Sequence, residues 1–79
     1  MQNYKNLDGQ SGIVGYEIGD DFIIVKFKEA SKSGYTTYKY SYTSAGEDEV
    51  EKMKELASSG DGLDEFINSS VRKKYEDRS

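Results

Sequence analysis

Alternation of hydrophobic and polar residues predicts three strands in the first half of the chain. The clearest case is the segment 34–42, GYTTYKYSY, in which tyrosines recur at every second residue from position 38. That spacing is typical of a strand with one aromatic face, because successive side chains of a strand point to opposite faces. We therefore expect a strand over 35–42, with Tyr38, Tyr40 and Tyr42 facing the core.

Two shorter alternating segments, 11–18 and 22–28, precede the tyrosine strand. Gly19 and Asp20 separate them, and a two-residue loop that begins with glycine predicts a type II′ hairpin turn. Gly15 interrupts the first segment and predicts a bulge or a weak point in its strand. The side chains that we expect to face the core are Val14, Tyr16, Ile18, Ile23, Val25 and Phe27.

The pattern changes to a helical period in the second half of the chain. Ser44, followed three residues later by Glu47, has the form of a capping box and predicts that a helix begins there. Gly60 or Gly62 is available to end this helix in the left-handed conformation, and a second helix is predicted from about residue 63. The apolar residues spaced three and four apart are Val50, Met53, Leu56 and Ala57 in the first helix and Leu63, Phe66, Ile67, Val71 and Tyr75 in the second.

These elements predict an α+β domain in which a three-stranded antiparallel meander is followed by two helices, in the order β-β-β-α-α. Both helices need an apolar surface, and only the tyrosine-rich face of the sheet offers one, so we expect both to pack on that face. The domain is expected over 11–76. A flexible N-terminal arm, 1–10, in which Tyr4 or Leu7 is available for docking, precedes it, and a tail, 77–79, follows it.

Composition narrows the possible functions. The 79 residues include seven Tyr and three Phe, which favours a folded chain, and they include no Cys and no His. Because the commonest zinc ligands are missing, we expect neither a metal nor a cofactor. The longest apolar run, 22–25, is far shorter than the roughly 20 residues of a membrane span. We therefore expect a cytoplasmic protein without a membrane partner.

The residue patterns encode no known reaction. The chain has no Ser/His/Asp or Cys/His arrangement, no phosphate-binding glycine loop and no dinucleotide fingerprint. The acidic segments 47–51 and 61–65 lack the ligand spacing of a calcium loop and fit the first turns of helices. We predict a protein that is not an enzyme. The alternative is a small hydrolase or transferase that uses a tyrosine or a carboxylate with a shifted pKa.

Cations gather on the sheet face that is predicted to lie opposite the core. Lysines alternate there with Ile24 and Thr37, and they could contact phosphates while a tyrosine stacks on a base. The alternative is an ordinary solvated face whose lysines discourage edge pairing. A second basic cluster, with Lys74 and Arg78 among its members, follows the second helix and also suits the helix dipole. The residues predicted to bind a partner are Lys26, Lys28, Tyr35, Lys39, Arg72 and Lys73.

Five short motifs stand in order within the predicted elements: Ser11-x-Ile13 with Gly15-Tyr16, Ile23-x-Val25-x-Phe27, Tyr38-Lys39-Tyr40, Ala57-x-Ser59-Gly60, and Asn68-x-x-Val71-Arg72-x-x-Tyr75. In this order and spacing they resemble the KTSC domain, a family named from the C-terminal segment of some lysyl-tRNA synthetases and also found as free-standing small bacterial proteins. The resemblance covers 11–75 and implies a fold like the one above, without an assigned activity. The residues to which it gives a structural role are Tyr16, Tyr38, Tyr40, Asn68, Arg72 and Tyr75.

The tyrosine stripe has two interpretations. It is either core beneath the helices, with a hydroxyl paired to Arg72 or Asn68, or a platform on which bases stack; we favour the core. The expected function is a small interaction module that binds RNA weakly, or another protein, through the lysine face, as a monomer or a weak dimer. The alternative is a protein adaptor, or a homodimer formed through the edge of the sheet.

Overall fold

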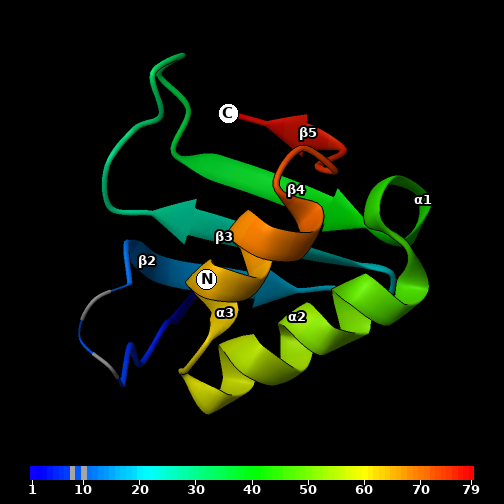
Figure 1. Ribbon diagram of the computed structural model, residues 1–79, viewed down its shortest axis with the longest axis horizontal. Helices are drawn as coiled ribbons and strands as arrows, with labels where there is room; N and C mark the ends of the chain where they lie inside the picture. The colour runs from blue at the N-terminus through cyan, green and yellow to red at the C-terminus, as the bar shows by residue number, and fades with distance from the viewer. Residues whose placement is uncertain (8, 10) are drawn as a thin grey trace.

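Three antiparallel strands, β2 (Ile13–Ile18), β3 (Phe22–Phe27) and β4 (Thr37–Ser41), form the centre of the sheet in the computed structural model (Figure 1). The short strands β1 (Gln2–Asn3) and β5 (Asp77–Arg78) pair with the outer two, which gives the order β1-β2-β3-β4-β5. The structure describes residues 1–7, 9 and 11–79. Within those residues the α+β class with an antiparallel sheet is confirmed, but the sheet has five strands instead of three.

Helical segments follow β4. They are α1 (Tyr42–Ala45), α2 (Glu47–Ser59), α3 (Leu63–Phe66) and a π-helix, η1 (Ile67–Val71), which continues α3 without a break. Figure 1 shows α2 and α3 in front of the same face of the sheet. The first predicted helix corresponds to α2 and the second to α3 with η1, whereas α1 is an additional turn that the sequence pattern does not predict.

The core lies between that sheet face and the helices. Ile23 stands opposite Tyr40 in the register of β3 and β4, and Val25 stands opposite Tyr38, so the aliphatic and the tyrosine stripes share one face. Ile23, Val25 and Tyr40 are at most 1% exposed, which confirms their predicted place in the core. The helical residues that complete the core are Ala45, Val50, Met53, Ala57, Leu63, Ile67 and Val71.

A β-bulge in β2 changes which of its side chains are buried. The register against β3 shifts between Ile13 and Gly15, as the glycine predicted. Because a bulge adds one residue to one strand, it reverses the alternation of faces before it. Ile13 is therefore 1% exposed and Val14 is 40% exposed, so the predicted core position of Val14 is wrong. Ile18 is also 40% exposed, at the end of the strand, and does not join the buried core.

The turn between β2 and β3 is not the predicted type II′ turn. The N–H of Gly19 donates to the carbonyl of Phe22 at 3.0 Å, so Asp20 and Asp21 are the loop residues. Gly19 does not have a positive φ. Glycine suits this position for a different reason: a Cβ there would overlap the ring of Phe22, which lies directly over the backbone.

The strand β4 ends at Ser41 because this residue caps α1. The N–H of Ser44 donates to the Ser41 hydroxyl at 3.1 Å, and the N–H of Ser41 donates to the Ser44 hydroxyl at 3.0 Å. These reciprocal bonds form a capping box. The capping box predicted at Ser44 and Glu47 is therefore wrong by one turn. Helix α2 begins after Gly46, which makes no side-chain cap, and it ends at Gly60 in the left-handed conformation, as predicted.

Both ends of the predicted tyrosine strand, 35–42, lie outside β4. Tyr42 belongs to α1, where its half-buried ring packs against the core and its hydroxyl donates to a carboxylate oxygen of Glu51 at 2.6 Å. Tyr35 precedes β4 in a turn held by Ser31, whose N–H donates to the Tyr35 carbonyl at 2.8 Å. The Tyr35 N–H donates in return to the Ser31 hydroxyl at 3.2 Å. These bonds take Tyr35 out of the strand pleat.

Both ends of the chain pair with the sheet. The predicted arm, 1–10, contributes β1, and it buries Tyr4 to 7% exposure while Leu7 stays 68% exposed. Positions 8 and 10 of that arm lie outside the described residues. The predicted tail, 77–79, contributes β5 and continues along β4, where the N–H of Ser79 donates to the carbonyl of Thr37 at 2.8 Å.

Candidate functional site

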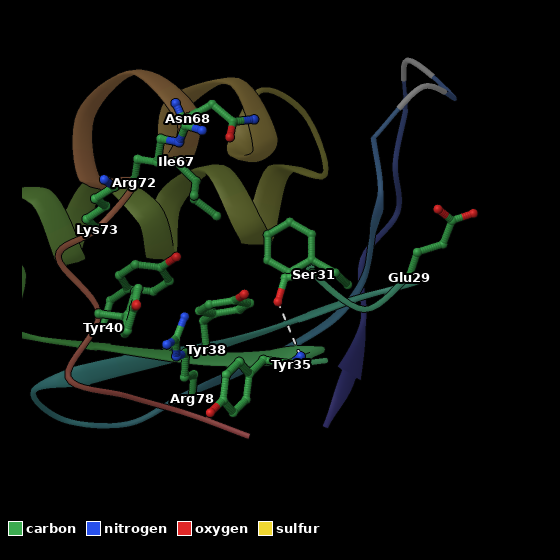
Figure 2. Close-up of a pocket in the computed structure, with 12 residues that line it drawn as sticks. Glu29, Ser31, Tyr35, Tyr38, Tyr40, Ile67, Asn68, Arg72, Lys73 and Arg78 are labelled. Atoms are coloured by element: carbon green, nitrogen blue, oxygen red, sulfur yellow. Dashed lines mark hydrogen bonds between the residues drawn. The ribbon is translucent and has the colours of Figure 1, made fainter. Parts of the chain in front are cut away.

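A cleft of about 360 Å³ opens between the end of the helical layer and the β4 side of the sheet (Figure 2). Its charged lining groups are Arg72, Lys73, Arg78 and a single carboxylate, Glu29. Ser31, Ile67 and Asn68 also contribute to the lining. We call it the tyrosine cleft after its aromatic lining, which consists of Phe27, Tyr35, Tyr38, Tyr40 and Tyr75.

The aromatic rings of the cleft pack against one another. The ring of Tyr38 is nearly perpendicular to that of Phe27, at 89° with centroids 5.7 Å apart. It meets the ring of Tyr75 at 69° and 5.3 Å. Edge-to-face contacts of this kind are favourable for aromatic pairs. Strands β3 and β4 and the segment after η1 thus meet in one cluster of rings that lines the cleft.

Arg78 reaches the cleft from the C-terminal strand. It stands opposite Tyr38 in the pairing of β4 and β5, which puts its side chain on the helix-covered face of the sheet. The guanidinium carbon lies 4.2 Å from the ring centroid of Tyr35 and 5.0 Å from that of Tyr75. Both distances are within the range of cation–π attraction. Arg78 therefore joins the loop that carries Tyr35 to the C-terminal segment.

Tyr40 lines the cleft from within the buried core. The residue is 1% exposed, and its hydroxyl makes no hydrogen bond within the part of the chain that the structure describes. The predicted pairing of a core tyrosine with Arg72 or Asn68 is therefore not formed at Tyr40. Burial raises the pKa of Tyr40 well above its ordinary value, and the neighbouring Tyr38 and Tyr75 add to this effect. The hydroxyl consequently remains a hydrogen-bond donor at neutral pH.

Arg72 and Lys73 form the basic rim of the cleft. Both follow directly on η1, both are exposed, and Figure 2 shows them above the ring of Tyr40. Cations at the end of a helical segment complement its dipole, which explains part of their placement. With Arg78 they give the lining three cations against one carboxylate, in a chain whose formal net charge is −4. The cleft is thus a local positive site on an acidic protein.

The structure divides the six predicted binding residues between two faces. Tyr35, Arg72 and Lys73 line the cleft, as do the structural-motif residues Asn68 and Tyr75. The hydroxyl of Tyr16, the motif residue of β2, instead donates to Gln2 at 2.9 Å.

The three lysines of the predicted set lie away from the cleft. Lys26 and Lys39 stand in β3 and β4 at positions that alternate with the core residues, so they lie on the opposite face of the sheet. Lys28 follows the end of β3 and lines a separate cavity with Gly12 and Phe27. The Lys39 ammonium lies 3.3 Å from the carboxylate of Glu76, so it is already paired.

Sequence patterns grouped Arg78 with the basic cluster after the second helix but did not connect it with Tyr35. A strand of two residues is too short to show a periodicity, so β5 leaves no such signal in the sequence. Phe27 was recognised as a core residue, but its second role in lining the cleft depends on the position of the loop that follows it.

No helix within residues 1–7, 9 and 11–79 is long and apolar enough to cross a membrane. In the same residues, no group of three or more His, Cys, Asp or Glu side chains is arranged to hold a metal ion.

Comparisons with known proteins do not assign the chain to a family. No family model matches it, and no curated protein or solved structure gives a significant match. The resemblance to the KTSC domain therefore stays a prediction that depends on the five short motifs.

Proposed function

We propose that this protein is a non-enzymatic module that binds single-stranded RNA weakly, and that the tyrosine cleft is its binding site. The observation that carries the proposal is that Arg72, Lys73 and Arg78 line one cavity together with four tyrosines. Cations attract phosphates, and aromatic rings stack on unpaired bases, so this combination suits a single strand. Membership of the KTSC family, in which RNA binding is suggested by its occurrence beside a synthetase, is part of the same proposal.

The cleft is a better candidate than the lysine face. Lys39 is paired with Glu76, and its ammonium also lies 4.7 Å from the ring centroid of Phe22. Tyr35, the aromatic residue expected on that face, lies in the cleft instead. Lys26 and Lys28 are exposed there without the tyrosine that was expected to stack on a base. The lysine face therefore offers charge without the predicted stacking partner.

The alternatives to RNA binding have less support. To act as a nucleophile or a general base, Tyr40 would have to lose its proton, whereas its raised pKa keeps it protonated. A homodimer through the sheet edge would require unpaired backbone N–H and C=O groups along an edge strand. The short strands β1 and β5 already occupy parts of both edges.

The test compares two variants that each lose two exposed cations. Arg72→Gln/Lys73→Gln changes the rim of the cleft. The matched control is Lys26→Gln/Lys28→Gln, in which Lys26 lies on the sheet face away from the helices and Lys28 follows the end of β3. Binding of a fluorescent single-stranded RNA is followed by anisotropy over a range of salt concentrations. Each phosphate contact contributes about −0.7 to the slope of log affinity against log salt, so the cleft variant should flatten the slope by about 1.4. The control variant should keep the wild-type slope, and both should keep the wild-type circular dichroism spectrum.

Two results would reject the proposal. If the control variant flattens the slope and the cleft variant does not, the lysine face is the site. If the wild type does not bind RNA even at about 20 mM salt, where the Debye length is roughly 20 Å and screening is weak, RNA is not the ligand. A protein partner then becomes the hypothesis to test.

A further inference from the structure

We propose that the tyrosine cleft holds one unpaired base of the bound strand, stacked on the Tyr35 ring, with the adjoining phosphate at Arg72 and Lys73. This inference rests on the proposed function and adds to it the recognition of a base as well as the backbone. It predicts that affinity depends on the presence of a base in the strand, which phosphate attraction alone does not require.

The size of the cleft favours a single base. A volume of about 360 Å³ is near the lower end of the roughly 300–1,000 Å³ that small-molecule sites occupy. Paired bases are covered on both faces by their neighbours in the stack, so only an unpaired base can offer its face to a tyrosine. The ligand is therefore a single strand or an unpaired loop.

Tyr35 has the properties of a contact residue. It is half-buried, it lies in a polar loop, and it is not among the aromatic residues that pack against the hydrophobic core. Tyr38 and Tyr75 do pack against that core, and Tyr40 is part of it. Of the four tyrosines of the cleft, Tyr35 is therefore the one that the fold needs least. Two hydrogen bonds to Ser31 nevertheless hold its backbone in place, and Figure 2 shows the one that the Tyr35 N–H donates to the Ser31 hydroxyl.

Arg78 shows that a flat group fits beside Tyr35. Its planar guanidinium lies 4.2 Å from the centroid of that ring and 5.0 Å from the centroid of Tyr75. Guanidinium planes and bases use the same kind of aromatic surface, and arginine itself also stacks on bases. A base that stacks on the same face of Tyr35 therefore takes the place of the guanidinium, and Arg78 turns to the phosphate.

The inner end of the cleft offers a hydrogen-bond donor to the base. The Tyr40 hydroxyl has no hydrogen-bond partner in the described chain. Every fully buried side-chain polar atom that the structure describes does have a partner, so this hydroxyl is not fully buried and is open to the cleft. Carbonyl oxygens on the edge of a base are suitable acceptors. The ring of Tyr35, the hydroxyl of Tyr40 and the rim cations thus match the face, the edge and the phosphate of one nucleotide.

The test uses the wild-type protein and two ligands of equal charge. One is a single-stranded RNA hexamer, and the other is a hexamer of the same sugar-phosphate backbone without bases. Stacking on one aromatic residue contributes about 1–3 kcal/mol, which should make the RNA bind about 5- to 150-fold more tightly than the abasic strand. Tyr35→Ala should remove most of that ratio by weakening the binding of RNA alone, and Tyr35→Phe, which keeps the ring, should retain it.

The outcomes separate this inference from the proposed function. Base recognition would be overturned if the wild type bound the two strands with equal affinity. RNA binding would remain intact in that case if the cleft variant still flattened the salt dependence and the control variant did not. Equal loss of affinity for both strands in Tyr35→Ala would also overturn it, because Tyr35 would then act on the backbone or on the fold. Failure of both strands to bind would reject the proposed function itself.

Discussion

The ammonium of Lys39 lies 3.3 Å from the carboxylate of Glu76, and the backbone N–H of Glu76 donates to the carbonyl of Lys39 at 2.6 Å. Two contacts between the same pair of residues therefore attach the segment before β5 to β4. The two side chains are 36% and 44% exposed, so the ion pair contributes little to stability. Together with the backbone hydrogen bond and the pairing of β4 with β5, it positions the strand that carries Arg78 into the cleft.

Glu76 gives a prediction for acid pH. Hydrogen bonding with the Ser41 hydroxyl, followed by that with the Lys39 ammonium, lowers the pKa of Glu76 from its ordinary value of 4.5. Because the folded-state pKa is the lower one, the ionised carboxylate contributes stability above pH 4.5 and loses it as the pH falls through the folded-state pKa. We expect Glu76→Gln to have a slightly lower Tm than the wild type at about pH 7, and we expect this difference to be smaller at about pH 3.

The control for this experiment is Glu17→Gln, which removes an exposed carboxylate from β2. Its Tm difference from the wild type should change less between the two pH values. A Tm difference for Glu76→Gln that is constant over the whole range would show that the ionisation of Glu76 is not coupled to folding.

Tyr40 should be required for folding through its ring and not through its hydroxyl. The ring is buried beneath the helices at 1% exposure, and truncating a buried aromatic side chain to Ala costs about 3–5 kcal/mol. Tyr40→Ala should therefore lose most of the stability of a domain of this size in urea denaturation. Tyr40→Phe keeps the ring and removes a hydroxyl without an internal partner, so its stability should be close to that of the wild type. A large loss in Tyr40→Phe would contradict this account.

Gly60 should tolerate alanine less well than Gly34 does. Both have positive φ, at 81° and 89°, where a side chain costs about 1–2 kcal/mol. A Cβ at Gly34 has no neighbour within 4 Å, whereas one at Gly60 would lie 2.5 Å from the Cβ of Lys5. Chemical denaturation should show a loss of about 1–2 kcal/mol for Gly34→Ala and a larger loss for Gly60→Ala. Equal losses would mean that the N-terminal segment does not pack on Gly60.

Ser41 should stabilise the junction between β4 and α1. Its hydroxyl accepts the N–H of Ser44, and loss of an N-cap side chain costs about 0.5–2 kcal/mol. We expect Ser41→Ala to fall in this range in denaturant unfolding. Glu47→Ala, which removes the side chain needed for the capping box predicted from sequence, should change stability by less than about 0.5 kcal/mol. A larger loss of stability in the Glu47 variant than in Ser41→Ala would instead support the capping box predicted at Ser44 and Glu47.

Periodicity alone was sufficient for the central strands. Ile23 and Val25 alternate with polar or half-buried neighbours without interruption, and a strand offers only two faces, so the buried set follows from the sequence. The same argument failed for Val14 because a bulge exchanges the two faces. Gly15 predicted the bulge but not its effect, since the faces depend on how the strand pairs with β3.

The helix start after the tyrosine strand was predicted at Ser44, and the structure caps a helix at Ser41 instead. Ser41 and Ser44 both have side chains that can cap a helix, and each is followed three residues later by a residue that can complete a box. The structure uses Ser41, which ends β4 early and turns Tyr42 toward Glu51 on α2. This choice depends on a contact between two elements, which a local pattern does not contain.

The sequence by itself determined the helix-covered face of β3 and β4, the end of α2 at a left-handed glycine at position 60 or 62, and the types of residue that suit a ligand. Only the tertiary structure decided which of those residues lie together. Hydrogen bonds to Ser31 take Tyr35 out of the strand, and the pairing of β5 with β4 brings Arg78 over its ring. These two residues are distant along the chain and share no periodicity. Their contact follows from long-range strand pairing, which forms only when the whole sheet has folded.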